Sequence, residues 1–146
     1  MRTIQIVNVR WFNATAWYGL WLSKLLNEGG HETRVFTLPH TANWNKAEEF
    51  GLKPEFLPFN SKNPLTYPSL YYKLRRVVKD FQPDIINCHR GEGFILCALL
   101  RYELKSFGLV RTRGDQRLPK TNLPNLTLHK HAADQIIATN SRMADY

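Results

Sequence analysis

The chain has 146 residues, 43% of them hydrophobic, which is enough for one domain with a single buried core. Lysine and arginine outnumber aspartate and glutamate by 20 to 12, and the net charge of +8 favours an anionic partner such as nucleic acid, an acidic membrane surface or a phosphorylated substrate. There is no run of 18 apolar residues and no secretory signal pattern, so neither a membrane span nor secretion is expected.

The first third of the chain is typical of strand, helix and strand. Residues 4–9 (IQIVNV) are apolar and rich in β-branched side chains, and residues 32–37 (ETRVFT) form the next such run. Between them, apolar residues recur at helical spacing until Gly29-Gly30 ends the pattern. These helical positions are Trp17, Leu20, Trp21 and Leu25.

The middle of the chain is an irregular connection followed by a basic helix. Five of the eight prolines fall between Pro39 and Pro68, which leaves room for a short helix near Lys46–Phe50 and a strand near Glu55–Phe59. An amphipathic helix then ends near Phe81. Its cations are either the solvated back of the helix, the interpretation that we favour, or a patch that faces a membrane. They are Lys73, Arg75, Arg76 and Lys79.

The remaining elements continue the alternation of strands and helices. Strands are predicted at 84–88 (DIINC), 109–113 (LVRTR) and 134–139 (DQIIAT). A helix that is apolar nearly all round covers Gly91 to Leu104, and another lies around Leu126–Ala133. The predicted fold class is therefore α/β, a Rossmann-like, doubly wound parallel sheet of six strands in a single domain.

Polar loops follow several of these strands at the edge where ligands bind in an open parallel sheet. They are RWFNATA after the first strand, His89-Arg90-Gly91-Glu92 after the fourth, RTRGDQR after the fifth and Asn140-Ser141 after the sixth. His89 either faces this cleft, or it caps the strand or hydrogen-bonds a neighbouring carbonyl. Gly91 and Gly93 are interpreted as turn and packing glycines.

Two arginines on one strand have the strongest chemical implication. Strand alternation places Arg111 and Arg113 on the same face, and burial of an unpaired guanidinium is costly. Each arginine is therefore either paired with Asp115, Glu92 or Asp134, or forms a fork for a phosphate or carboxylate of a substrate. A single arginine can serve both purposes.

Other classes of site find little support in the sequence. Neither GxGxxG nor GxxxxGK[ST] occurs, which argues against dinucleotide and ordinary NTPase sites. Cys88 and Cys97 have no metal or redox spacing and are expected to be reduced and buried, while His129 and His131 point apart on a helix. No metal site is expected. The positive charge has no nucleic-acid motif beside it, so no nucleic-acid partner is expected either.

The order of motifs resembles a known family. The run PDIINCH, an apolar helix, GLVRTRGD and HKHAADQIIATNSRM, with GGHETRVFT earlier, is similar to the N-terminal half of GT-B glycosyltransferases of the retaining family four. The resemblance implies that residues 1–146 are the acceptor-binding domain. Because the sequence stops barely more than one turn after Ser141, a good helix cap, we expect the chain to be a fragment cut before or within the next helix. It also implies that an absent C-terminal domain binds the nucleotide sugar, which is a substrate, so that no cofactor is needed.

The resemblance also implies the site residues. His89 matches the second histidine of the family's H-x-H motif, and Asn87 stands at the position of the first histidine. As the candidate catalytic residue, His89 would position the donor sugar or the acceptor without acting as a general base. The start of the first helix replaces a glycine-rich loop, and Gly114 stands where the family carries a histidine. The implied residues for acceptor or phosphate are Asn13, Ala14, Thr15, Arg90, Gly91, Arg111, Arg113, Asp115 and Asn140.

The expected partners are a nucleotide-sugar donor and a saccharide or lipid-linked acceptor of the cell-envelope type. The expected location is the cytoplasm, with peripheral contact to the anionic inner face of the membrane. The 146-residue chain alone is expected to be inactive. A stand-alone Rossmann-like module that binds an anionic small molecule without catalysis is the alternative.

Overall fold

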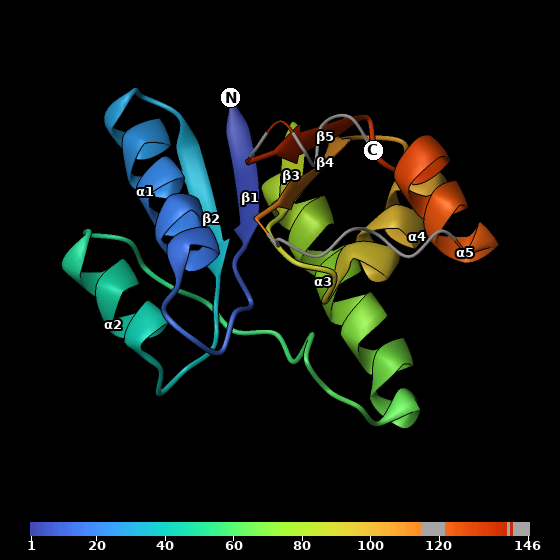
Figure 1. The fold of residues 1–146 in the computed structure, drawn as a ribbon, viewed down its shortest axis with the longest axis horizontal. Helices are drawn as coiled ribbons and strands as arrows, with labels where there is room; N and C mark the ends of the chain where they lie inside the picture. The colour runs from blue at the N-terminus through green and yellow to red at the C-terminus, as the bar shows by residue number, and fades with distance from the viewer. Residues whose placement is uncertain (115–121, 140, 142–146) are drawn as a thin grey trace.

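The computed structural model describes residues 1–114, 122–139 and 141, and it alternates strands with helices (Figure 1). The strands are β1 (Arg2–Ile6), β2 (Glu32–Phe36), β3 (Ile85–Cys88), β4 (Gly108–Arg113) and β5 (Gln135–Ala138). The α-helices are α1 (Ala14–Glu28), α2 (Ala42–Glu49), α3 (Tyr67–Phe81), α4 (Phe94–Leu104) and α5 (Leu123–Thr127). A 3₁₀ turn, η1 (Pro64–Thr66), precedes α3, and a π-helical segment, η2 (Leu128–Ala132), follows α5.

The five strands form one parallel sheet in the order β2-β1-β3-β4-β5, which confirms the predicted Rossmann-like α/β class. The order reverses between β1 and β3, so the crevice beyond their carboxyl ends is the expected place for a ligand. Thr3 pairs with Ile85 and Cys88 with Arg111, a register that aligns the carboxyl ends of three central strands.

The prediction of a strand over Glu55–Phe59 is wrong. The chain there makes only an isolated bridge, in which the Glu55 amide donates to the Val35 carbonyl at 2.8 Å and the Glu55 carbonyl accepts from Thr37 at 2.9 Å. Pro54 and Pro58 flank this bridge, and proline has no N–H with which to continue a ladder. The sheet of the described residues therefore has five strands rather than six.

Two helices also differ from their predicted positions. α2 begins four residues before the predicted start, because the Thr41 side chain accepts a hydrogen bond from the Trp44 amide and caps the helix there. The helix predicted around Leu126–Ala133 is divided between α5 and η2. Neither difference moves the carboxyl edge of the sheet.

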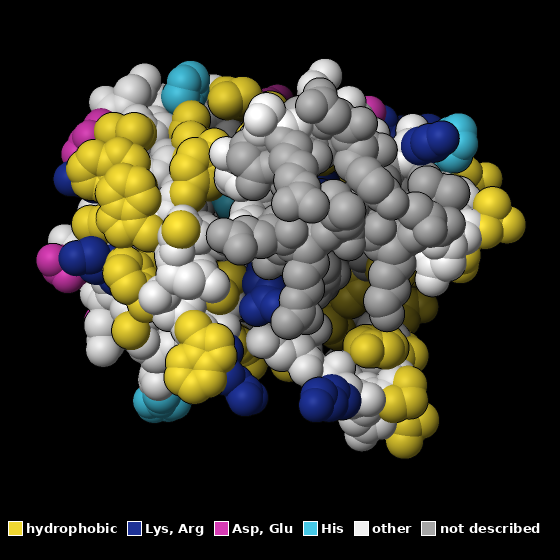
Figure 2. Space-filling view, in the orientation of Figure 1, with side chains coloured by type: hydrophobic (Ala, Val, Ile, Leu, Met, Phe, Trp, Pro, Cys, Tyr) yellow, Lys and Arg dark blue, Asp and Glu magenta, His cyan; other side chains and the backbone are white. Residues whose placement is uncertain are grey.

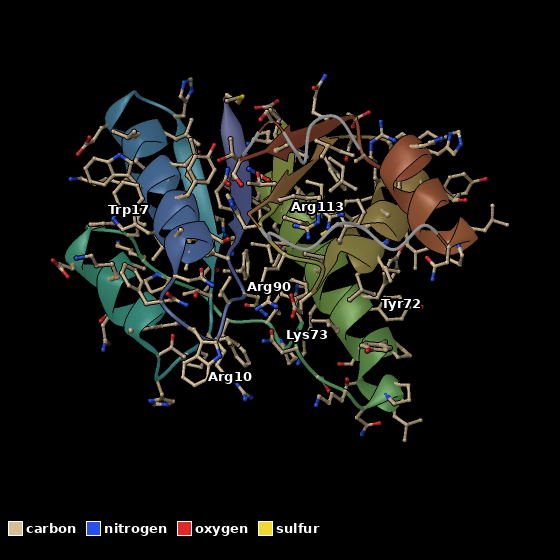
Figure 3. All side chains as sticks on the ribbon, in the orientation of Figure 1. Arg10, Trp17, Tyr72, Lys73, Arg90 and Arg113 are labelled. Atoms are coloured by element: carbon tan, nitrogen blue, oxygen red, sulfur yellow. The ribbon has the colours of Figure 1, made fainter. Side chains whose placement is uncertain are left out.

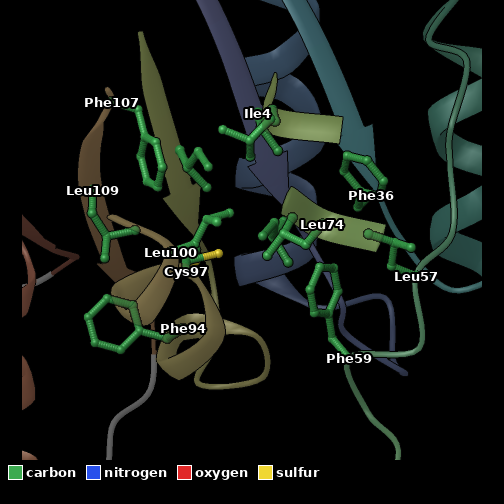
Figure 4. Close-up of a cluster of buried hydrophobic side chains, with 14 of the residues drawn as sticks. Ile4, Phe36, Leu57, Phe59, Leu74, Phe94, Cys97, Leu100, Phe107 and Leu109 are labelled. Atoms are coloured by element: carbon green, nitrogen blue, oxygen red, sulfur yellow. The ribbon is translucent and has the colours of Figure 1, made fainter. Parts of the chain in front are cut away.

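Helices cover the sheet on both faces, and the core has one cluster on each side. Val7, Val9 and Val35 pack with Leu20 of α1 on one face. On the other face, Ile4, Ile6 and Ile86 pack against α3 and α4 in the larger cluster, which Figure 4 shows around Leu74, Cys97 and Leu100. No helix among the described residues is long and apolar enough to cross a bilayer.

Candidate functional site

A groove of about 780 Å³ opens at the carboxyl end of β3, between the start of α3 and the exposed side of α4. Its polar lining includes three cations, Lys62, Arg90 and Arg111, and one carboxylate, Glu92. The apolar part of the wall consists of Phe59, Tyr67, Ile95, Leu96 and Leu99. Among the described residues, the groove lining therefore combines a net positive charge with an apolar surface.

Arg111 forms the buried end of this groove. Its side chain is on the α4 face of the sheet, 5% exposed, with the guanidinium 6.0 Å from the centre of the Phe94 ring. Nη1 donates to the carbonyls of Cys88 and Thr112 at 3.0 and 2.6 Å. These bonds fix the orientation of the guanidinium while leaving its positive charge in place.

Two of the carboxylates predicted as partners for Arg111 and Arg113 bind other groups. Asp134 accepts from Arg101 Nε at 2.8 Å and from the Leu109 amide at 2.8 Å. Glu92 Oε2 lies 3.5 Å from Arg90 Nε, and Asp115 lies outside the described residues. Two of the three carboxylates are thus engaged by other arginines.

The turn from β3 into α4 positions Arg90 at the mouth of the groove. Gly93 has a φ of 82°, and a Cβ there would lie 2.8 Å from Phe59 Cδ1, so this position requires glycine. A Cβ at Gly91 would have no neighbour within 4 Å. Gly93 is therefore a packing glycine within the turn, and Gly91, whose carbonyl accepts from the Phe94 amide at 3.2 Å, is an exposed part of the same turn and of the groove wall.

His89 is buried on the opposite face of the sheet. It is 1% exposed, its Nε2 lies 2.8 Å from Gln5 Oε1, and the Tyr18 ring packs edge-on against it at 5.9 Å. Burial, and secondarily the charge of Arg111, lower the pKa of His89 to about 3, so the ring is neutral at physiological pH. The structure shows the alternative in which His89 bonds a neighbouring carbonyl, here that of the Gln5 side chain. Contact of His89 with a substrate stays a prediction.

The residues predicted at the start of α1 line a second, smaller pocket at the same carboxyl edge of the sheet. Ala14 and Thr15 line a pocket of about 70 Å³ together with Thr112, Gly114 and Thr139. A Cβ at Gly114 would lie 2.1 Å from Thr15 Oγ1, so the end of β4 approaches the start of α1 very closely.

Asn13 caps α1, its Oδ1 accepting from the Ala16 amide at 3.0 Å. The Arg113 carbonyl accepts from the Thr139 amide at 3.2 Å and from Thr139 Oγ1 at 3.1 Å, which ties the end of β4 to the residue after β5. Arg113 is partly buried, and Asn140 lies outside the described residues. The structure thus divides the predicted residues between a groove with Arg90, Gly91 and Arg111 and a pocket with Ala14 and Thr15.

The sequence did not predict the polar groove residues Asn60, Ser61 and Lys62 of the irregular connection, nor Tyr67 at the start of α3, because they reach the groove only through the fold. Asn8 was missed as well. It is 1% exposed, donates to Asn60, and its Oδ1 has no hydrogen-bond partner among the described residues. The sequence did contain a signal, because Asn8 is a polar residue between two valines of an apolar run, and a buried polar group needs a partner.

Several cations lie toward this end of the molecule, and others lie elsewhere on its surface (Figure 2). Figure 3 labels Arg10, Arg90 and Lys73 toward the carboxyl end of the sheet. Figure 2 shows Lys and Arg side chains at the centre and lower edge of the same view, with hydrophobic side chains beside them over the start of α3. This arrangement suits a ligand that is anionic in one part and apolar in another.

The sequence matches a family model. The model described as Glycosyltransferase Family 4 matches residues 18–146. None of the curated proteins compared with the chain matches it.

Solved structures share the fold. A glycosyltransferase from Rickettsia africae has a TM-score of 0.82 at 12% identity, covering 99% of this chain and 38% of its own. HepE of Anabaena, in complex with UDP and glucose, has a TM-score of 0.78 at 14% identity, covering 99% and 40%. The lipopolysaccharide outer core galactosyltransferase WaaB, in its apo form, has a TM-score of 0.71 at 15% identity, covering 99% and 41%. The chain spans about two fifths of the length of these proteins.

Proposed function

The chain belongs to Glycosyltransferase Family 4, and from this premise we propose that it is the acceptor-binding half of an enzyme that transfers a sugar from a nucleotide sugar. The acceptor is a saccharide or a lipid-linked molecule of the cell-envelope type. The observation that carries the proposal is the groove with Arg90 and Arg111 at the carboxyl edge of the sheet. The presence of UDP and glucose in HepE and the description of WaaB as a lipopolysaccharide galactosyltransferase support it.

Within this proposal, Arg90 and Arg111 bind an anionic group of the acceptor. Arginine suits this task because its planar guanidinium can donate two parallel hydrogen bonds to a phosphate or carboxylate. His89 directly precedes Arg90 in the chain, and its ring bonds the Gln5 side chain of β1. His89 therefore positions the turn that carries Arg90. With a pKa of about 3 it is too weak a base to take a proton from an acceptor hydroxyl at neutral pH.

Chemistry would take place where this edge meets a second domain that binds the donor. A nucleoside diphosphate leaves the sugar with developing negative charge, which preorganised cations and N–H donors stabilise. We expect most of these donors on the second domain, and we expect retention at the anomeric carbon.

Proton NMR of the first-formed product, taken before it mutarotates, tests retention: inversion of the anomeric configuration relative to the donor would exclude it.

The reading frame beyond the codon for Tyr146 tests the two-domain proposal. We expect it to continue for roughly one or two domains' length with a second alternation of strands and helices and a nucleotide-sugar site. An immediate stop codon would contradict this proposal. It would favour instead a stand-alone module for an anionic small molecule, which the net charge of +8 supports.

Peripheral contact with anionic membrane on the cytoplasmic side is the last part of the proposal. Lys73, Arg76 and Lys79 are exposed on α3 beside Tyr72, whereas Arg75 bonds Glu103 of α4 at 2.7 Å. Each cation near an anionic surface is worth about 1 kcal/mol, so replacing all three by glutamine should weaken binding to phosphatidylglycerol vesicles by about 100-fold. Equal flotation of this variant and of a Lys24, Lys46 and Lys53 triple glutamine control would refute contact through α3.

A further inference from the structure

α4 has an apolar stripe that the core does not cover. Its residues Phe94, Cys97 and Leu100 are buried in the larger core cluster. Ile95 and Leu99, one turn apart, are each 55% exposed and line the groove. A helix that is apolar nearly all round is ordinarily buried on every side, so this stripe is suited to an apolar ligand surface.

The charged end of the groove adjoins this stripe. Arg111 lies against Phe94, the first residue of α4, and Arg90 lies in the turn that leads into the same helix. Lys62 adds a third cation, and Glu92 is the one carboxylate that the described part of the chain contributes to the lining. The groove is therefore cationic where α4 begins and apolar along Ile95 and Leu99, within a volume typical of sites for small organic ligands.

We propose that the groove binds one amphiphilic molecule, a phosphate or diphosphate ester of an apolar chain. Its phosphate contacts Arg90 and Arg111, and its chain lies along Ile95 and Leu99. A free saccharide would leave the apolar stripe in water, and an inorganic anion would use only the charged end. The inference rests on the proposed function, since it identifies the acceptor as a lipid-linked phosphate.

The test is equilibrium binding to the 146-residue chain by calorimetry, with farnesyl diphosphate below its micelle concentration as the probe. Inorganic pyrophosphate carries the same anionic group without the chain, and farnesol carries the chain without the charge. We expect farnesyl diphosphate to bind at least about tenfold more tightly than either one, because partial burial of the chain and the charged hydrogen bonds both contribute.

Two pairs of variants assign the contacts. Leu99→Gln should weaken farnesyl diphosphate about 5- to 10-fold and leave pyrophosphate unchanged, since it alters only the apolar stripe. Arg90→Gln should weaken both ligands about tenfold or more. The matched controls are Leu123→Gln, an equally simple change at a residue that is 77% exposed on α5, and Lys53→Gln, an exposed cation outside the groove. Both controls should bind like the wild-type chain.

Several outcomes would overturn the inference. One is pyrophosphate binding as tightly as farnesyl diphosphate with no effect of Leu99→Gln. Another is binding to phosphatidylglycerol vesicles but not to monomeric farnesyl diphosphate, which would indicate a bilayer surface rather than a site for one molecule. If the full-length enzyme glycosylates a water-soluble saccharide and Leu99→Gln leaves that rate unchanged, the inference fails while the proposed transferase function stands.

Discussion

Gly93 determines how the chain turns from β3 into α4, and therefore where Arg90 lies. Its φ of 82° opposes any side chain, and a Cβ at this position would lie only 2.8 Å from the Phe59 ring. Gly93→Ala should lower the free energy of unfolding by ~2–4 kcal/mol, from backbone strain and overpacking together. Urea denaturation measures this, and Gly91→Ala is the control because a Cβ there has no neighbour within 4 Å. Equal stability of the two variants would contradict the geometry of this turn.

His89 should make the stability of the fold depend on pH. Its pKa is lowered from 6.5 to about 3, chiefly by burial, so the unfolded chain binds the extra proton between these values. The stabilisation from neutral His89 is complete above pH 6.5 and is lost as the pH falls toward 3, at up to about 1.4 kcal/mol per pH unit.

Urea unfolding at several pH values between 7 and 4 measures this dependence. Relative to wild type, His89→Gln should show a shallower loss of stability on acidification, since glutamine does not titrate. His131→Gln, at an exposed position, should retain the wild-type slope. Identical slopes for all three proteins would show that His89 is not held neutral in the fold.

At the scale of elements, variants of Asn13 at the start of α1 can distinguish a role in helix stability from a role in anion binding. Asn13 caps the helix, so Asn13→Ala should cost about 1 kcal/mol of stability. Asn13→Asp should retain the cap and the stability, because aspartate caps equally well and its charge suits the helix N-terminus. If an anion also binds beside Thr15, the aspartate should weaken that binding by repulsion.

Thermal denaturation and phosphate binding, measured on the same two variants, distinguish these roles. Loss of stability in Asn13→Ala with unchanged phosphate binding in Asn13→Asp would restrict Asn13 to a structural role. Equal stability of wild type and Asn13→Ala would contradict the observed cap.

Local pattern predicted most of the elements but not their contacts. The helical spacing of Trp17, Leu20 and Leu25 marked α1, and the break after DIINC placed Arg90 at the carboxyl edge. The strand at Glu55–Phe59 failed because apolar residues in a proline-flanked segment satisfy the same pattern without a continuing ladder. Such errors arise where backbone hydrogen bonding, which the pattern does not contain, decides the outcome.

The candidate site was predictable only in part, for the same reason. The location of Arg111 follows from strand alternation, but its burial against Phe94 depends on how α4 crosses the sheet. The burial of His89 depends on Gln5 and Tyr18, which are distant in sequence. The sequence predicted only that α4 is apolar nearly all round, and the fold shows that one of its sides lines a groove.

At the scale of the whole molecule, our proposal is that the chain provides one edge of a reaction site. The parallel sheet brings the ends of β1, β3 and β4 together, and the groove and the pocket at α1 both open there. The donor-binding contacts are expected on a second domain that meets this edge. The 146-residue chain alone should therefore bind an acceptor without transferring a sugar.

The most direct test of this account is a transfer assay with the protein encoded by the complete reading frame. Radiolabelled nucleotide sugars would be supplied one at a time with a lipid and saccharide extract of the source cells. We expect label to enter product from one donor, with the rate reduced about tenfold or more in Arg90→Gln and unchanged in Lys53→Gln. Absence of product with every donor, or equal rates for Arg90→Gln and wild type, would contradict the account.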